Sequence, residues 1–222
     1  MSEEVGGAVE EQGESQVTMV DIAYESIMSG IVTRRFAGGD ILQEAKIAQA
    51  LGLSRTPVRE ALGRLEGEGL LTRSGRVLMV RNVTVKEYLE ALALRRMLES
   101  EAILLACGSI PVDVLTELKE RVEELRDPTS ISAEDHWQLD DDIHLTIAHS
   151  SGNDLMANMI ADLRLKTRLF NLKKVPNRFA PGREEHLAII ESLLKQQPEE
   201  ARAAMLRHLD NVKNGILGAL GF

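Results

Sequence analysis

The 222-residue chain has 44% hydrophobic residues but only 3% aromatic residues, and its formal net charge is −9. A core built from Leu, Ile, Val, Ala and Met favours helix over sheet. The chain has no run of 18 apolar residues, which excludes a transmembrane helix, and its acidic N-terminus is not typical of a secretory signal. A lone cysteine, Cys107, excludes an intramolecular disulfide and fits a reducing compartment. We therefore expect a cytoplasmic protein with no membrane partner.

The negative charge is distributed unevenly along the chain. Residues 1–17 hold five acidic residues and no basic ones, which predicts a disordered acidic tail. Residues 18–82 hold nine basic residues against seven acidic ones, whereas residues 83–222 hold seventeen against twenty-three. The basic excess is small, but it is confined to one segment. The overall charge therefore does not exclude a nucleic-acid partner for residues 18–82.

Residues 18–82 are predicted to begin with three helices. Apolar residues at helical spacing indicate a first helix over about 18–31 and a short second helix over about 43–51. Gly52 is expected to adopt a left-handed conformation in the turn that follows. A third helix then starts at Ser54 and ends at Gly67 or Gly69. Two helices joined by a short turn that contains glycine are typical of a helix-turn-helix.

The third helix carries the most informative stretch of the chain. Ser54 or Thr56 can cap its N-terminus, and Pro57 falls in the first turn, where its missing N–H costs nothing. Apolar residues at helical spacing form a buried stripe: Val58, Ala61, Leu62 and Leu65. Beside that stripe, Arg55, Thr56 and Arg59 share one sector of the helix. Two guanidiniums and a hydroxyl at a helix N-terminus suit a negatively charged partner, and we expect double-stranded DNA.

A short hairpin is predicted after the third helix. Two strand-like segments, 70–72 and 77–80, flank the polar tip Arg73-Ser74-Gly75-Arg76. A hairpin in this position is the wing of a winged helix, although an ordinary surface hairpin is the alternative. The predicted DNA contacts combine the third helix and this tip, and they are Arg55, Thr56, Arg59, Arg64, Arg73 and Arg76.

Residues 83–222 are predicted to be all helical. Proline and glycine breaks separate six predicted helices, at about 84–107, 111–126, 132–150, 153–171, 182–196 and 198–219. Six helices with short connections favour an antiparallel bundle large enough to enclose a cavity. The predicted fold is therefore mainly α, with a winged helix-turn-helix domain at 18–82 and a helical bundle domain at 83–222.

Four residues of this predicted bundle could hold a metal ion. Asp140 and His144 are four residues apart, so both project from one helix face. His186 and His208 each share a face with apolar residues and are predicted to point inward. Three imidazoles and one carboxylate suit a divalent ion such as Zn²⁺, Ni²⁺ or Mn²⁺. The spacing alone leaves the alternative open that these histidines are buried and bond backbone carbonyls, and Asp141 is a fallback ligand.

The N-terminal motifs resemble the winged helix of GntR-family transcriptional regulators. The matching segments are Leu42-Gln43-Glu44, Ile47-Ala48, residues 51–62, Leu65-Glu66 and Glu68-Gly69-Leu70. The resemblance implies that Arg55 and Arg59 read the operator. Ala45 stands where that family often has a basic residue, and Lys46 could serve instead.

The C-terminal part resembles the ligand-sensing FCD domain of the FadR-type subgroup, in a shorter six-helix variant. The markers are Arg95, Leu98-Glu99, Glu101-Ala102, Asp140, His144, Ser151-Gly152-Asn153, Glu185-His186 and His208-Leu209. This resemblance implies that Asp140, His144, His186 and His208 bind a divalent metal.

The predicted function is that of a homodimeric, non-enzymatic transcriptional regulator. Arg95 is the candidate for gripping a small organic-acid effector beside the metal, and a salt bridge to Glu99 is the alternative. Arg164 and Arg168 share a helix face that either lines the same cavity or is solvated. Two other functions remain open: a DNA-binding protein with a purely structural metal, and a metallo-hydrolase. The sequence contains neither the base of an H-E-x-x-H motif nor a nucleophile motif, which disfavours the hydrolase.

Overall fold

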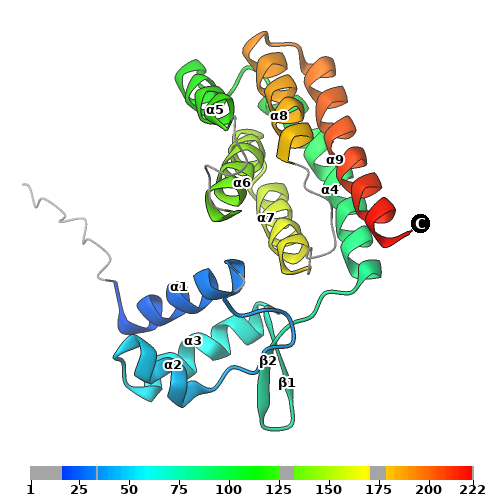
Figure 1. The fold of residues 1–222 in the computed structure, drawn as a ribbon. Helices are drawn as coiled ribbons and strands as arrows, with labels where there is room; N and C mark the ends of the chain where they lie inside the picture. The colour runs from blue at the N-terminus through cyan, green and yellow to red at the C-terminus, as the bar shows by residue number, and fades with distance from the viewer. Residues whose placement is uncertain (1–16, 34, 126–132, 171–178, 222) are drawn as a thin grey trace, which may run out of the picture.

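The computed structural model describes residues 17–33, 35–125, 133–170 and 179–221. A small winged helix-turn-helix unit lies at one end of the molecule, and a larger helical bundle forms the rest (Figure 1). The mainly α fold predicted from the sequence is confirmed. The predicted acidic tail falls almost entirely outside the described residues. No helix in the described ranges is long and apolar enough to cross a membrane.

The N-terminal unit contains three helices and a hairpin: α1 (Met19–Val32), α2 (Glu44–Leu51), α3 (Arg55–Gly67), β1 (Leu71–Ser74) and β2 (Val77–Val80). α2 ends at Gly52, whose φ of 65° is left-handed, as predicted. Ser54 is the N-cap residue of α3, but among the described residues no side chain forms the capping hydrogen bond there. The buried stripe of α3 agrees with the prediction from helical spacing.

The first strand of the hairpin extends further than the sequence predicted, the second strand is as predicted, and the tip is shorter. Leu71 pairs with Val80 and Ser74 pairs with Val77, which leaves Gly75 and Arg76 as a two-residue turn. Gly75 has a φ of 60°, a conformation that glycine adopts without steric cost. Arg73 therefore lies in β1 rather than at the tip.

The C-terminal bundle contains α4 (Val85–Ala106), α5 (Val112–Glu124), α6 (Ala133–Ser150), α7 (Asp154–Leu169), α8 (Phe179–Leu194) and α9 (Pro198–Leu220). All six predicted helices are present, with ends within three residues of the prediction. Thr84 and Glu87 form a capping box at the start of α4, in which each side chain accepts a hydrogen bond from the backbone N–H of the other residue. This cap defines where the bundle begins. α4 is central, because it packs against α6, α7 and α9.

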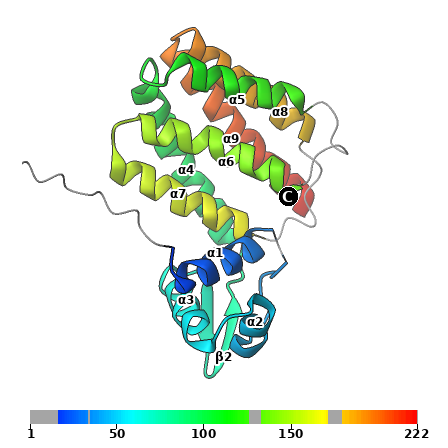
Figure 2. The same ribbon diagram turned by 90° about the vertical axis from the view of Figure 1, so that its left-hand side faces the viewer.

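The two units have separate hydrophobic cores. The core of the bundle is drawn from α4 to α9, and that of the N-terminal unit from α1 to α3 and the hairpin. α7 joins them, because Leu165 and Leu169 on its C-terminal half pack against the core of the N-terminal unit. Both views place α7 next to that unit (Figure 2). α7 therefore packs directly against the N-terminal unit, and Glu87 of α4 adds an ion pair to Arg81 at 2.6 Å.

Candidate metal centre and DNA-binding surface

Four side chains of the bundle converge at one buried point. Asp140 and His144 lie one turn apart on α6, His186 comes from α8, and His208 comes from α9. One ligand atom from each residue lies within 4.8 Å of the others. The three imidazoles are at most 5% exposed, and their ring centroids lie 4.7 to 5.6 Å apart. The structure thus brings together all four residues that the sequence indicated.

Two carboxylates outside the cluster orient two of its imidazoles. Nδ1 of His144 contacts Glu99 of α4, and Nδ1 of His208 lies 2.8 Å from Oε2 of Glu185. We place the proton of each ring on Nδ1, where it is donated in a hydrogen bond to the carboxylate. Each Nε2 then carries a lone pair. Nε2 of His144 is buried and has no hydrogen-bond partner among the described residues. A buried acceptor without a partner is costly, and a bound cation would remove that cost.

The protonation states of the cluster suit metal binding. Burial lowers the pKa of His144 to about 3, and the nearby Arg164 contributes. Burial also lowers the pKa of His208. Burial alone would raise the pKa of Asp140, but Arg164 and His186 outweigh it and hold that pKa well below its usual range. At neutral pH His144 and His208 are neutral and the carboxylate of Asp140 is charged, as a divalent ion requires of its ligands.

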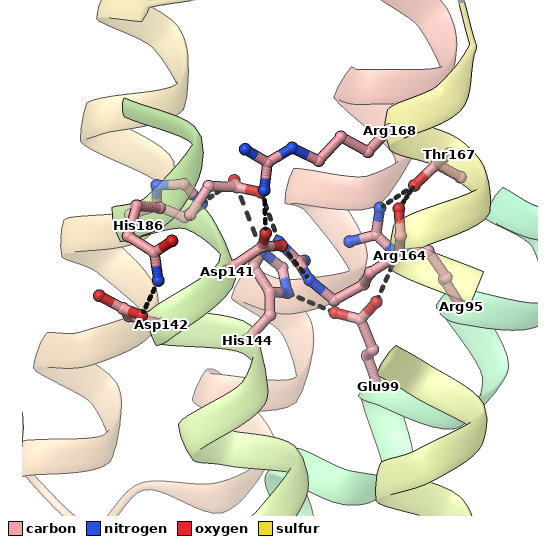
Figure 3. A network of polar contacts seen from close by, with 11 residues as sticks. Arg95, Glu99, Asp141, Asp142, His144, Arg164, Thr167, Arg168 and His186 are labelled. Carbon is pink, nitrogen blue, oxygen red and sulfur yellow. Dashed lines mark hydrogen bonds and ion pairs between the residues drawn. The ribbon is translucent and has the colours of Figure 1, made fainter. Parts of the chain in front are cut away.

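A group of arginines and acids borders the cluster on its α7 side (Figure 3). Nη2 of Arg164 donates to Oδ2 of Asp140 at 2.6 Å, and its Nε donates to Oδ1 of Asp141 at 2.9 Å. Nη1 of Arg168 donates to Oδ2 of Asp141 at 2.7 Å. Asp141, the fallback ligand, is therefore engaged with these two arginines. Nη1 of Arg164 is buried and, within the part of the chain that the structure describes, has no hydrogen-bond partner.

Arg95 makes the alternative contact that the sequence had left open. Its Nε lies 2.6 Å from Oε1 of Glu99, and its Nη1 donates to Oγ1 of Thr167 at 3.2 Å. Both Arg95 and Glu99 are buried, and Figure 3 shows their side chains next to each other. Arg95 therefore forms the salt bridge to Glu99, and its contact with an effector stays a prediction. Arg95 holds Glu99, and Glu99 in turn holds His144.

Sequence reasoning missed several polar residues around the cluster. Glu99 was considered only as the salt-bridge partner of Arg95, and Glu185, which precedes His186, was noted only as part of a motif. Arg164 and Arg168 were left undecided between a cavity and a solvated face, and the structure shows both side chains at least 90% buried. Their spacing of four residues was the available signal, but the buried side of α7 could not be identified from it.

The predicted DNA-reading arginines lie on an exposed face of the N-terminal unit. The side chains of Arg55 and Arg59 are 64% and 68% exposed, and both contact Glu44 at the start of α2. Hydrogen bonds from Arg59 and Arg55 outweigh burial and lower the pKa of Glu44 to about 2. Thr56 is exposed beside them. α2, α3 and the hairpin lie at the end of the molecule away from most of the bundle (Figure 2).

A groove of about 450 Å³ connects this face to the hairpin. Arg59, Arg73 and Arg76 line it together with Glu44. Nη2 of Arg73 also lies 2.6 Å from Oε2 of Glu66. These arginines therefore form one surface with the N-terminus of α3, as the winged-helix prediction requires.

Arg64 lies apart from the other predicted DNA contacts. Its guanidinium carbon is 3.9 Å from the ring centroid of Tyr24 on α1, and its Nε is 3.1 Å from Oε1 of Glu68. Nine residues separate it from Arg55, which places the two on opposite sides of α3. Arg64 thus faces α1, and the structure does not bring it to the groove.

Comparisons with known proteins agree with this architecture. Residues 20–77 match the bacterial regulatory proteins of the gntR family, and residues 90–211 match the FCD domain. The chain is 28% identical over 194 residues to the Nta operon transcriptional regulator of Aminobacter aminovorans, across 85% of this chain and 92% of that protein. It is also 28% identical over 206 residues to the transcriptional regulator LutR of Bacillus subtilis, across 81% and 93%.

The fold is similar to that of a solved regulator. McbR/YncC of E. coli superposes with a TM-score of 0.78 at 23% identity, over 90% of this chain and 97% of that one. The FCD match alone covers more than half of the chain, and the GntR match covers the helix-turn-helix and the first strand of the wing. The chain therefore belongs to the GntR family of bacterial transcriptional regulators, in the group with a C-terminal FCD domain, and it is a DNA-binding regulator.

Proposed function

We propose that this regulator senses a small organic acid, which binds together with a divalent metal in the bundle and changes operator affinity. Asp140, His144, His186 and His208 would hold the metal, and the three imidazoles and one carboxylate suit Zn²⁺, Ni²⁺ or Mn²⁺. When bound, such an ion supplies a Lewis-acidic centre for a carboxylate oxygen. The observation that carries the metal is the buried, unpartnered Nε2 of His144, judged against the described residues.

Arginines on α7 support the effector part of this proposal. Nη1 of Arg164 is a buried donor for which the described residues offer no acceptor, and the same guanidinium touches Asp140 of the cluster. Nη1 of Arg164 can donate a charge-assisted hydrogen bond to the carboxylate of an acid while Nε and Nη2 stay on Asp141 and Asp140. Arg168, one turn further along α7, adds a second positive charge. An acid at this point would be held from two sides.

α7 also offers a physical route from the site to the DNA-binding unit. Arg164, Thr167 and Arg168 face the cluster side, whereas Leu165 and Leu169 pack against the N-terminal core. A cleft of about 620 Å³ separates the two units there, bounded by both α7 and the end of α3. Effector binding would alter operator affinity only if the acid binds one placement of α7 better than another.

We expect acid binding to depend on the metal. In isothermal titration calorimetry with citrate, malate and acetate, Zn²⁺-loaded protein should bind at least one acid that the metal-free protein does not bind. Arg168→Gln should lower the affinity for that acid by about tenfold or more, since a hydrogen bond to a charged group contributes about 1.5–3 kcal/mol. The affinity for Zn²⁺ should stay unchanged.

Arg121→Gln is the matched control, because Arg121 pairs with Asp142, which is not among the four clustered residues. An acid that binds equally with and without metal would contradict the proposal. Loss of structure on chelation, with no acid changing operator affinity, would instead support a purely structural metal.

We also propose that the protein acts as a homodimer on a palindromic operator, because one recognition helix reads too few base pairs for selectivity. α4 and α7 pack together, and we infer that their large apolar side chains between 45% and 71% exposed form one surface: Leu94, Met97, Leu105, Leu155 and Met159. A second copy related by a dyad would cover this surface with the same residues.

Met97→Glu is expected to convert the dimer to a monomer, because it places a charge within the apolar surface. Sedimentation velocity measures the change, and affinity for a two-half-site operator should fall with it. Val112→Glu is the control, since Val112 is 63% exposed at the start of α5, outside this surface. A Met97→Glu protein that stays dimeric would place the interface elsewhere.

A further inference from the structure

The predicted DNA-reading face contains an acidic residue, Glu44, which contacts both Arg55 and Arg59. Its carboxylate receives three hydrogen bonds, from Nε of Arg55 at 2.8 Å and from Nε and Nη2 of Arg59 at 2.9 Å each. A carboxylate beside the phosphate backbone repels it, so the residue lowers general DNA affinity. Its position therefore requires a benefit other than stronger binding to phosphates.

The two arginines present different donors of their guanidinium groups to the carboxylate of Glu44. Arg59 gives the carboxylate the side edge of its guanidinium, Nε and Nη2, which is the bidentate arrangement that holds a carboxylate most firmly. Arg55 gives only Nε, and no contact to either of its terminal nitrogens is found among the described residues. The end edge of Arg55, with its two parallel N–H donors, thus points to no residue of the protein.

That free edge matches a guanine. An arginine reads guanine in the major groove through two donors, one to O6 and one to N7. Arg55 can present both terminal nitrogens while its Nε stays on Glu44. The side chain of Arg55 has several rotatable bonds, and ordering them on binding DNA costs conformational entropy. Because Nε is already held by Glu44, much of that cost is removed from the guanine contact. Arg59 would then act chiefly as the clamp that keeps the carboxylate still.

We propose that Glu44 is a specificity-determining, positioning residue: held by Arg59, it orients Arg55 for bidentate reading of a guanine and lowers binding to other DNA. The helix start contributes to this arrangement, because Glu44 is the first residue of α2, where a negative charge is favourable. The proposal deepens the DNA-binding function and rests on it, but it is independent of the metal and the effector.

The test is selection from a pool of random duplexes by the full-length wild-type protein, followed by fluorescence anisotropy with the selected duplex and a scrambled one. We expect the selected sequences to contain an invariant guanine in each half-site. Glu44→Gln should reduce the ratio of selected to scrambled affinity by about 5- to 150-fold, the discrimination of one bidentate arginine–guanine pair. Affinity for the scrambled duplex should rise, because a negative charge is removed.

Replacing that guanine by 7-deazaguanine tests the contact itself. The analogue lacks the N7 acceptor, so it should weaken binding by wild type and have little further effect on Glu44→Gln or Arg55→Ala. Glu44→Asp, which keeps the charge but shortens the side chain, should recover part of the preference. A purely structural role for Glu44 would not change the response to a single ring atom.

Glu60→Gln is the matched control, since Glu60 is exposed on α3 and no ion pair to it is found in the described part of the chain. It removes the same charge and should leave the affinity ratio unchanged. The proposal is overturned if Glu44→Gln keeps the wild-type ratio, or if it weakens both duplexes equally while thermal unfolding is unchanged. Enrichment of any sequence by wild type would still demonstrate DNA binding in either case.

Discussion

Zn²⁺ is expected to stabilise the metal-free wild-type protein strongly and to have little effect on the His144→Ala variant. At a free Zn²⁺ concentration 100 times the dissociation constant, binding to the folded state adds about 2.7 kcal/mol. For a domain of this size that corresponds to a rise of about 5–11 °C in the unfolding midpoint. Differential scanning calorimetry of chelator-treated protein, with and without added Zn²⁺, measures it.

The reason is that His144 is one of the four clustered residues and is buried. Its Nε2 has no hydrogen-bond partner among the described residues, and its Nδ1 contacts Glu99. The ring is therefore oriented before any ion binds. Glu99→Gln keeps the four ligands but removes that charge, and it should lower Zn²⁺ affinity by about 10- to 100-fold.

His149→Ala is the control for this prediction, because His149 is exposed on the same helix. It should respond to Zn²⁺ as wild type does. An equal rise in midpoint for His144→Ala and wild type would show that the ion binds elsewhere in the chain. If Zn²⁺ raises the unfolding midpoint of neither protein, the cluster holds no Zn²⁺. The same scan with Ni²⁺ and Mn²⁺ would follow.

Arg59→Ala is expected to weaken binding to the selected operator by about 1–3 kcal/mol. The variant loses the contacts of one exposed guanidinium, and it also removes two of the three hydrogen bonds that hold Glu44. The released carboxylate then repels phosphate more freely. Fluorescence anisotropy at several salt concentrations measures the loss and shows how much of it is electrostatic.

Arg207→Ala is the control, because it removes the same charge from an exposed position on α9, in the bundle. Its operator affinity should equal that of wild type. Arg64→Ala should cost less than Arg59→Ala, because Arg64 is engaged with Tyr24 and Glu68 on the side facing α1. Unchanged affinity for Arg59→Ala would contradict the placement of the DNA-binding face.

Helical periodicity predicted the secondary structure well because each helix buries one face. The stripe of α3 and the inward histidines of α8 and α9 follow from this spacing alone, since residues three and four apart lie on the same side. Less regular features were predicted less well. The hairpin tip was placed two residues too wide, because the strand character of Arg73 and Ser74 comes from pairing with Leu78 and Val77.

The amino-acid sequence by itself determined the winged helix-turn-helix, the six-helix bundle and the four residues of the cluster. These follow from local spacing, from turn residues such as Gly52, and from motifs that occupy a few consecutive turns. The tertiary structure alone decided which charged groups meet across helices. Glu99 on His144, Arg164 on Asp140 and the pairing of Glu44 with Arg55 all depend on how separate helices are placed side by side. A side chain's partner is set by that packing, and periodicity along one helix carries no information about it.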